Sequence, residues 1–142
     1  MMHNQVQYKD FTVDIEMLPL IENLNNSGIQ TLYSCCGLDE DGNKDTPARE
    51  LIKKNLRPYV IISADEKGYM FTRLLLLVQY KYLTSDKDSI KIPLIEIDYD
   101  YYEGTFRFTI QGVNSCSFKI FEFFINETLR LFKEIDYEKM VK

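Results

Sequence analysis

The segment 92–111 constrains the fold of this chain more than any other stretch, because apolar and polar residues alternate on both sides of a turn signal. Before Glu103-Gly104, apolar residues occupy every second position of 95–101, and acidic residues stand between them. After it, apolar and polar residues alternate again over 105–111. This pattern is typical of an antiparallel hairpin with one apolar and one solvated face. We therefore predict a sheet that ends in this hairpin.

The last long segment, 115–136, predicts a helix with little solvated surface. One narrow polar stripe runs along it, formed by Ser115, Lys119, Glu122, Asn126 and Arg130. Most other residues of 116–125 are apolar, including Phe118, Phe121 and Phe124. A helix of this kind is covered on more than one side. It should cover the apolar face of the hairpin, and we predict that it also forms a homodimer through residues 115–136.

Shorter patterns predict strands at 5–12, 29–35 and 59–65, and helices at 15–26, 48–56 and 66–83. Asp14 is the expected N-cap of the first helix, Pro19 lies near its first turn, and Gly28 suits the left-handed position after its end. For 66–83, alternation near its end favours a strand, whereas its length and a possible cap at Asp65 favour a helix.

Together these elements predict an α/β (α+β) fold with one domain, residues 1–142. Its sheet is a single-layer mixed sheet that ends in an antiparallel hairpin and is packed by helices, including the long C-terminal one. A chain of 142 residues with 45% apolar residues has enough material for one core.

Charge and cysteine content limit the functions that this chain can have. Seventeen basic and 22 acidic residues give 17 − 22 = −5, which disfavours binding to a phosphate backbone. The N-terminus has no apolar stretch typical of a signal peptide, and the longest apolar run, Leu74–Val78, is too short to cross a bilayer. Three cysteines do not form a disulfide framework. We expect a cytoplasmic protein with reduced thiols, no membrane partner and no nucleic-acid partner.

Most catalytic motifs are missing from the sequence. His3 is the only histidine, which argues against Ser-His-Asp and Cys-His catalysis and against histidine-rich zinc sites. No phosphate-binding or dinucleotide-binding glycine motif is present. In and after the polar loop 37–46, oxygen donors stand near calcium-loop spacing, at Asp39, Asp41, Asn43, Asp45 and Glu50, but Lys44 stands where the turn needs glycine. We expect no metal, no cofactor and no catalytic residue, and favour binding over turnover.

The run Thr31–Gly37, TLYSCCG, has three interpretations. Cys35 and Cys36 are small apolar residues at the end of a strand, or one of them is a nucleophilic thiolate, which needs nearby cations. In the third interpretation, the backbone N–H groups around Gly37 bind an anion. The basic segment Arg49–Arg57 and a stacking tyrosine would complete such a site. The candidate ligand-binding residues are Tyr33, Ser34, Cys35, Cys36, Gly37, Arg49, Arg57 and Tyr59.

The solvated face of the predicted hairpin carries Glu96, Asp98 and Asp100 on one strand. Successive carboxylates lie about 7 Å apart at a rise of about 3.4 Å per residue, so they repel one another. Arg107 on the partner strand is the cation expected to offset this repulsion.

The motif around TLYSCCG carries a resemblance. Residues 13–37 resemble small uncharacterised bacterial and phage proteins that have a helix, a glycine, a strand and then Thr-x-x-Ser-Cys-x-Gly. More distantly, Ser34-Cys35-Cys36-Gly37 is similar to the Ser-Cys-Ser-Gly-Arg motif of the wybutosine-pathway tRNA methyltransferases, although Leu38 stands in place of the arginine. The second resemblance implies an S-adenosylmethionine site around Ser34, Cys35 and Gly37.

Three functions stay open on the sequence alone. The first is a small phage- or prophage-type accessory protein that binds an anionic, nucleotide-like small molecule or a host protein without turnover, with a role in counter-defence. The second is an S-adenosylmethionine-dependent methyltransferase. The third is an inhibitor whose acidic residues mimic a nucleic-acid surface.

Overall fold

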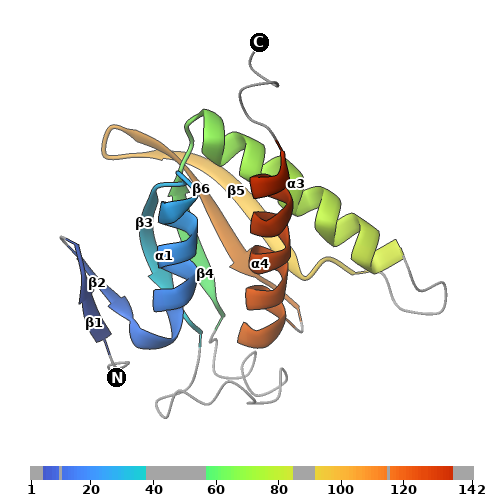
Figure 1. Cartoon of the computed structure of the whole chain (residues 1–142), viewed down its shortest axis with the longest axis horizontal. Coiled ribbons are helices and arrows are strands. Elements are labelled where there is room, and N and C mark those ends of the chain that lie inside the picture. The colour runs from blue at the N-terminus through green and yellow to red at the C-terminus, as the bar shows by residue number, and fades with distance from the viewer. Residues whose placement is uncertain (1–4, 10, 38–56, 85–91, 115, 136–142) are drawn as a thin grey trace.

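The computed structural model of the chain describes residues 5–9, 11–37, 57–84, 92–114 and 116–135. A four-stranded sheet has the strand order β3-β4-β6-β5. Its strands are β3 (Thr31–Cys35), β4 (Tyr59–Ser63), β5 (Ile95–Tyr102) and β6 (Thr105–Gly112). One face of the sheet is covered by the helices α1 (Leu18–Asn26), α3 (Glu66–Thr84) and α4 (Phe118–Glu134) (Figure 1). The predicted α+β class and the long C-terminal helix are thus confirmed.

The direction of the strands corrects one detail of the prediction. All neighbouring strands of the described sheet are antiparallel, so the expected mixed sheet is wrong. β4 and β5 do run in the same direction, because α3 connects them in a crossover. However, β6 lies between them, and no two parallel strands become neighbours.

The predicted hairpin is present, and its tip projects beyond the rest of the sheet. β5 and β6 pair from Ile95 and Gly112 to Tyr102 and Thr105. Glu103 and Gly104 close the turn with φ of 50° and 83°, as a two-residue turn of the primed type requires. β4 pairs with β6 only as far as Arg107, so the last residues of the hairpin extend past the end of β4 (Figure 1).

The strand expected at 5–12 is instead a separate hairpin of two strands. β1 (Gln5–Tyr8) pairs with β2 (Phe11–Asp14), and Lys9 between them has a φ of 54°. Because no glycine marks this turn, the sequence reads as one continuous strand. β2 lies next to β3, but the described strands form no hydrogen-bonded ladder between them.

The first helix begins later than expected. A 3-10 turn, η1 (Ile15–Met17), precedes α1, and the side chain of Asp14 makes no capping hydrogen bond. The predicted end is confirmed, since Gly28 has a φ of 87°. The N–H groups of Gly28 and Ile29 donate to the carbonyls of Asn25 and Leu24, which forms a Schellman motif.

Asp65 is confirmed as the cap of α3, whereas α4 begins later than the sequence predicted. Residues 66–83 are helical, and Asp65 Oδ1 accepts a hydrogen bond of 2.8 Å from Gly68 N. α4 begins after Ser117 and not at 115, because the Ser117 hydroxyl accepts a hydrogen bond from Ile120 N. The helix predicted at 48–56, and the predicted polar loop from residue 38 on, lie outside the described residues.

The core forms between the inner face of the sheet and the three helices. Phe118, Phe121 and Phe124 of α4 have no exposed surface within a single chain. They belong to the same buried cluster as Ile62 and Ile110 of the sheet. The burial on which the homodimer prediction rested is therefore already met inside one chain, and the homodimer itself stays a prediction.

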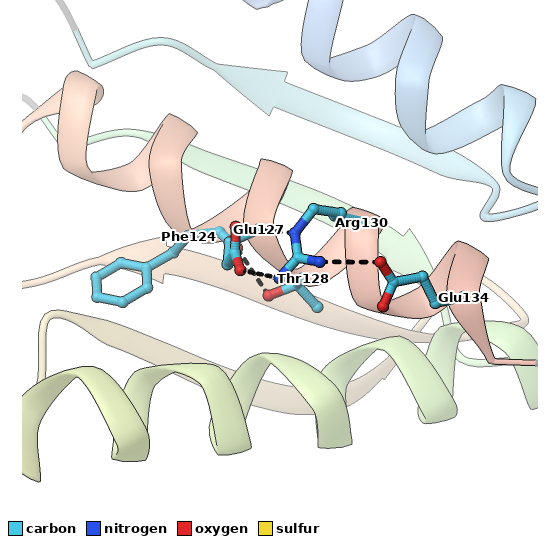
Figure 2. Close-up of polar contacts among 5 residues, drawn as sticks. All are labelled: Phe124, Glu127, Thr128, Arg130 and Glu134. Carbon is cyan, nitrogen blue, oxygen red and sulfur yellow. Dashed lines mark hydrogen bonds and ion pairs between the residues drawn. The ribbon is translucent and has the colours of Figure 1, made fainter. Parts of the chain in front are cut away.

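The solvated side of α4 is occupied by local polar contacts (Figure 2). Arg130 forms ion pairs with Glu127 and, at 2.9 Å, with Glu134. The hydrogen bond from Arg130 lowers the pKa of Glu127. On the buried side, the Thr128 hydroxyl donates to the Phe124 carbonyl at 2.7 Å. Among the described helices, none has the length and hydropathy that a bilayer crossing requires.

Candidate functional site

Asp14 ties β2 to the corner at which β3 ends. Its side chain is buried, and its Oδ2 accepts a hydrogen bond of 3.0 Å from the backbone N–H of Cys36. Gln5 Nε2 lies 3.5 Å from the other carboxylate oxygen. The sequence predicted that N–H groups near Gly37 bind an external anion. In the structure a carboxylate of the chain itself receives the N–H of Cys36, so an external anion would have to displace Asp14.

The surroundings of the thiols at this corner do not favour the thiolate that an activated nucleophile needs. Cys36 has no exposed surface, and Cys35 is half-buried. Burial raises the pKa of the Cys35 thiol, the Gly37 N–H lowers it, and the Asp14 carboxylate raises it, with a raised net pKa. A catalytic thiolate needs a lowered pKa. Cys35 is thus held as a neutral thiol.

The corner packs directly against the beginning of β4. A Cβ on Gly37 would lie 2.3 Å from Pro58 N and 2.4 Å from the carbonyl carbon of Arg57, and the φ of Gly37 is 67°. Cys35 pairs in register with Tyr59, whose pKa is raised by burial and by the neighbouring Cys35 and Asp14. Glycine is required here for backbone packing, whatever ligand the corner binds.

The structure brings together part of the predicted ligand site. Gly37, Arg57 and Tyr59 meet at the corner with the two cysteines, and Ser34 is half-buried on β3. Arg49 lies outside the described residues. Tyr33, two residues before Cys35 on β3, lies on the sheet face opposite the helices, which we call the outer face.

An open cleft of about 280 Å³ lies on the outer face between Tyr33 and Tyr102, and Arg107 contributes to its lining. Arg107 Nε donates to Asp100 at 2.8 Å, which confirms the predicted pair and raises the pKa of Arg107. The Arg107 guanidinium also lies 4.5 Å from the centre of the Tyr102 ring. This cleft can hold a planar group beside two tyrosines.

A second and larger feature lies on the opposite, helix-bearing face of the hairpin. Four aromatic side chains that are each about half exposed gather there, and we call them the aromatic surface: Tyr69, Tyr99, Tyr101 and Phe106. Phe106 lies 5.8 Å from Tyr99 with the rings parallel, and 4.8 Å from Tyr101, between ring centres. Four half-exposed rings present on the order of 400 Å². That is comparable to the largest apolar patches of monomeric proteins, which are often functional.

An open cavity at the N-terminus of α3 borders the aromatic surface and shares Tyr69 and Tyr99 with it. The cavity has a volume of about 460 Å³, and its lining consists of Ala64, Asp65, Glu66, Tyr69, Tyr99 and Phe108. Phe108 is nearly buried and connects the cavity to the core. The cavity therefore combines aromatic walls with two carboxylates.

Sequence reasoning missed the aromatic surface because it expected a helix to cover the whole apolar face of the hairpin. The helices cover Ile95 and Ile110, but the tip projects past β4. The sequence does carry a signal. The apolar positions nearest the turn are the aromatic residues Tyr99, Tyr101 and Phe106, whereas those farther away are isoleucines.

Comparison with known proteins identified no matching family model, and neither the curated proteins nor the solved structures gave a significant match. Within the part of the chain that the structure describes, no group of three or more His, Cys, Asp or Glu side chains is placed to hold a metal ion.

Proposed function

We propose that this chain is a small accessory protein that binds a basic partner protein through the aromatic surface, without chemical turnover. The observation that carries the proposal is the cluster of four half-exposed aromatic rings on a projecting hairpin tip. Tyrosine and other aromatic residues are enriched where binding energy is concentrated in protein interfaces. The phage-type role and the role in counter-defence, which the sequence resemblance implies, are compatible with such a binder.

Charge supports a basic partner. Asp65 and Glu66 lie at the rim of the aromatic surface, and the chain as a whole has a formal charge of −5. The outer side of the same hairpin exposes Glu96, Asp98 and Asp100. A partner that approaches this tip meets a negative field, which speeds association with basic surfaces and repels acidic ones.

The thiols support two parts of the proposal. These are binding without turnover and a reducing compartment. The pKa of the Cys35 thiol is raised mainly by burial, which disfavours the thiolate that nucleophilic catalysis needs. None of Cys35, Cys36 and Cys116 forms a disulfide. Cysteines without a disulfide suit the cytoplasm, where we propose that the protein acts.

A selection of random peptides displayed on phage tests the proposal. We expect the selected peptides to contain arginine or lysine beside apolar residues, and to bind the purified chain in calorimetry. Tyr101→Ser should weaken their binding at least about tenfold, the loss expected for one aromatic hot-spot residue. The matched control is Tyr33→Ser, an equally exposed tyrosine on the outer face, which should have no effect.

Two results would overturn the proposal. Peptides whose binding depends on Tyr33 and not on Tyr101 would assign the function to the outer face. A dimer in light scattering that Tyr101→Ser converts to monomers would assign the aromatic surface to a second copy of the chain.

A second candidate is a planar, anionic small molecule such as a nucleotide, bound in the outer-face cleft. Arg107 favours it, because its Nε and Nη2 donate to Asp100 while Nη1 donates to no other described residue. A nucleotide that raises the thermal midpoint of the wild type but not of Arg107→Gln would support this candidate. An equal shift for both proteins would exclude the cleft as its site.

A further inference from the structure

The cavity of the aromatic surface has a chemical character that identifies one kind of guest. Three of its six lining residues are the aromatic side chains Tyr69, Tyr99 and Phe108, two are the acidic side chains Asp65 and Glu66, and none is basic. Aromatic faces attract cations through the negative potential of the ring, and carboxylates add a full negative charge. An anionic guest, including a phosphate or a carboxylate, is repelled by the same groups.

The carboxylates of Asp65 and Glu66 can still accept hydrogen bonds from a guest. Asp65 Oδ1 accepts the hydrogen bond from Gly68 N that caps α3, and its second oxygen bonds no other described residue. The carboxylate of Glu66 forms no hydrogen bond or ion pair with any described residue, and it is exposed. The negative charge at this helix end is therefore not neutralised by a described ion pair.

The basic residues nearest in sequence to Asp65 and Glu66 do not line the cavity. A Cβ on Gly28 would lie 2.6 Å from Lys67 Nζ, so this amine lies at the turn after α1 and not in the cavity. Arg73 lies one helical turn after Tyr69 on α3, and its guanidinium lies 5.6 Å from the centre of the Tyr69 ring. Its Nη1 donates to the Tyr69 hydroxyl at 3.2 Å. Tyr69 thus already interacts with one guanidinium, but Arg73 is not part of the cavity lining.

We propose that the cavity receives an arginine side chain of the partner protein. A guanidinium is planar, so it can stack on Tyr69 or Tyr99 while its N–H groups donate to Glu66 and to the second oxygen of Asp65. Lysine offers a compact charge without the planar stacking and binds less tightly. This inference rests on the proposed function, because it assigns a role to one residue of the same partner.

The probe is N-acetyl-arginine methylamide, followed by amide chemical shifts of the isotope-labelled chain. We expect saturable shifts at residues 64–69 and 99, with millimolar affinity that falls in high salt. The citrulline analogue has nearly the same shape without the charge, and it should produce no such shifts. Glu66→Gln should weaken binding about threefold, as expected when one exposed charge pair is lost. Tyr99→Leu should weaken it about fivefold.

Glu96→Gln is the matched control, because it removes an exposed carboxylate from the outer face and should leave the affinity unchanged. All variants change exposed side chains, and circular dichroism checks that each one folds. Equal shifts with arginine and citrulline, shifts that map to the outer face, or no shifts at all would overturn the proposal.

The outcomes separate the two proposals. If the selected peptides depend on Tyr101 but bind Glu66→Gln as well as the wild type, the arginine site is wrong and the proposed function stands. If the arginine probe binds at 64–69 while no peptide depends on Tyr101, the cavity chemistry stands and the proposed function is wrong.

Discussion

Replacement of Asp14 tests whether the corner at the end of β3 is structural or an anion site. In the wild type, Oδ2 of this buried carboxylate accepts the N–H of Cys36, a residue with no exposed surface. Asp14→Ala removes this acceptor from the buried N–H. Asp14→Asn keeps an oxygen acceptor of the same shape but removes the charge.

The magnitude follows from the contact. A buried donor without a partner costs about 1–3 kcal/mol, and a hydrogen bond to a charged group contributes about 1.5–3 kcal/mol. The long contact with Gln5, at 3.5 Å, adds little. We therefore expect Asp14→Ala to lower the free energy of unfolding by about 2–3 kcal/mol, and Asp14→Asn by about 1 kcal/mol.

Urea denaturation measures both losses. With a slope of about 1–3 kcal/mol per molar urea, the midpoint of Asp14→Ala should fall by about 1 M. The control Asp98→Ala removes an exposed carboxylate and should stay within about 0.5 kcal/mol of the wild type. Alkylation of Cys35 should be faster in Asp14→Asn, because the carboxylate that helps to raise the thiol pKa is gone. If Asp14→Ala is as stable as the wild type, the structural role of Asp14 is refuted and the anion-site interpretation of the corner is favoured.

Three further predictions test the fold by urea denaturation. Gly37→Ala should lower the free energy of unfolding by about 2–4 kcal/mol, because Gly37 has a left-handed backbone and the new Cβ would meet the backbone of Arg57 and Pro58, just before β4. An unchanged urea midpoint would contradict this close packing. Phe121→Ala should lower the free energy of unfolding by about 3–5 kcal/mol, because Phe121 is fully buried. Phe123→Ala should lower it markedly less, because Phe123 is half-exposed. Equal losses would contradict the assigned orientation of α4. Burial raises the pKa of Cys116 to about 12, so the unfolded state ionises first above pH 9 and the free energy of unfolding falls with rising pH. Cys116→Ala should reduce this fall by up to about 1.4 kcal/mol per pH unit, and an identical pH profile in both proteins would show that the thiol is not buried.

The sequence predicted those elements whose signals are local. The turn at Glu103-Gly104, the left-handed Gly28 and the cap at Asp65 are each defined by a few neighbouring residues, and all three are confirmed. The helix at 66–83 is also confirmed, although alternation near its end favours a strand. Length and capping outweigh a short alternating stretch, because a helix gains stability from every added turn.

The errors concern contacts between distant segments. Asp14 has the sequence context of an N-cap, but its carboxylate bonds the N–H of Cys36, which is 22 residues away. No local pattern indicates this contact. For the same reason, the pairing of β6 between β4 and β5 could not be read from the order of elements alone.

The candidate site could be predicted only in part. Tyr33 and Arg107 were both considered from the sequence, but not as walls of one cleft. The aromatic surface depends on how far the hairpin projects past β4, and this length is fixed by strand register and not by residue type. The aromatic residues near the turn were visible, whereas their exposure was not.

Hydrogen–deuterium exchange of the chain, alone and with a saturating selected peptide, tests the central claim most directly. The account predicts slower exchange at 64–70 and 99–106, which form the aromatic surface and its cavity, and no change at 31–35. Slower exchange at 31–35 with no change at 64–70 would show that the partner binds the outer face and would contradict the account.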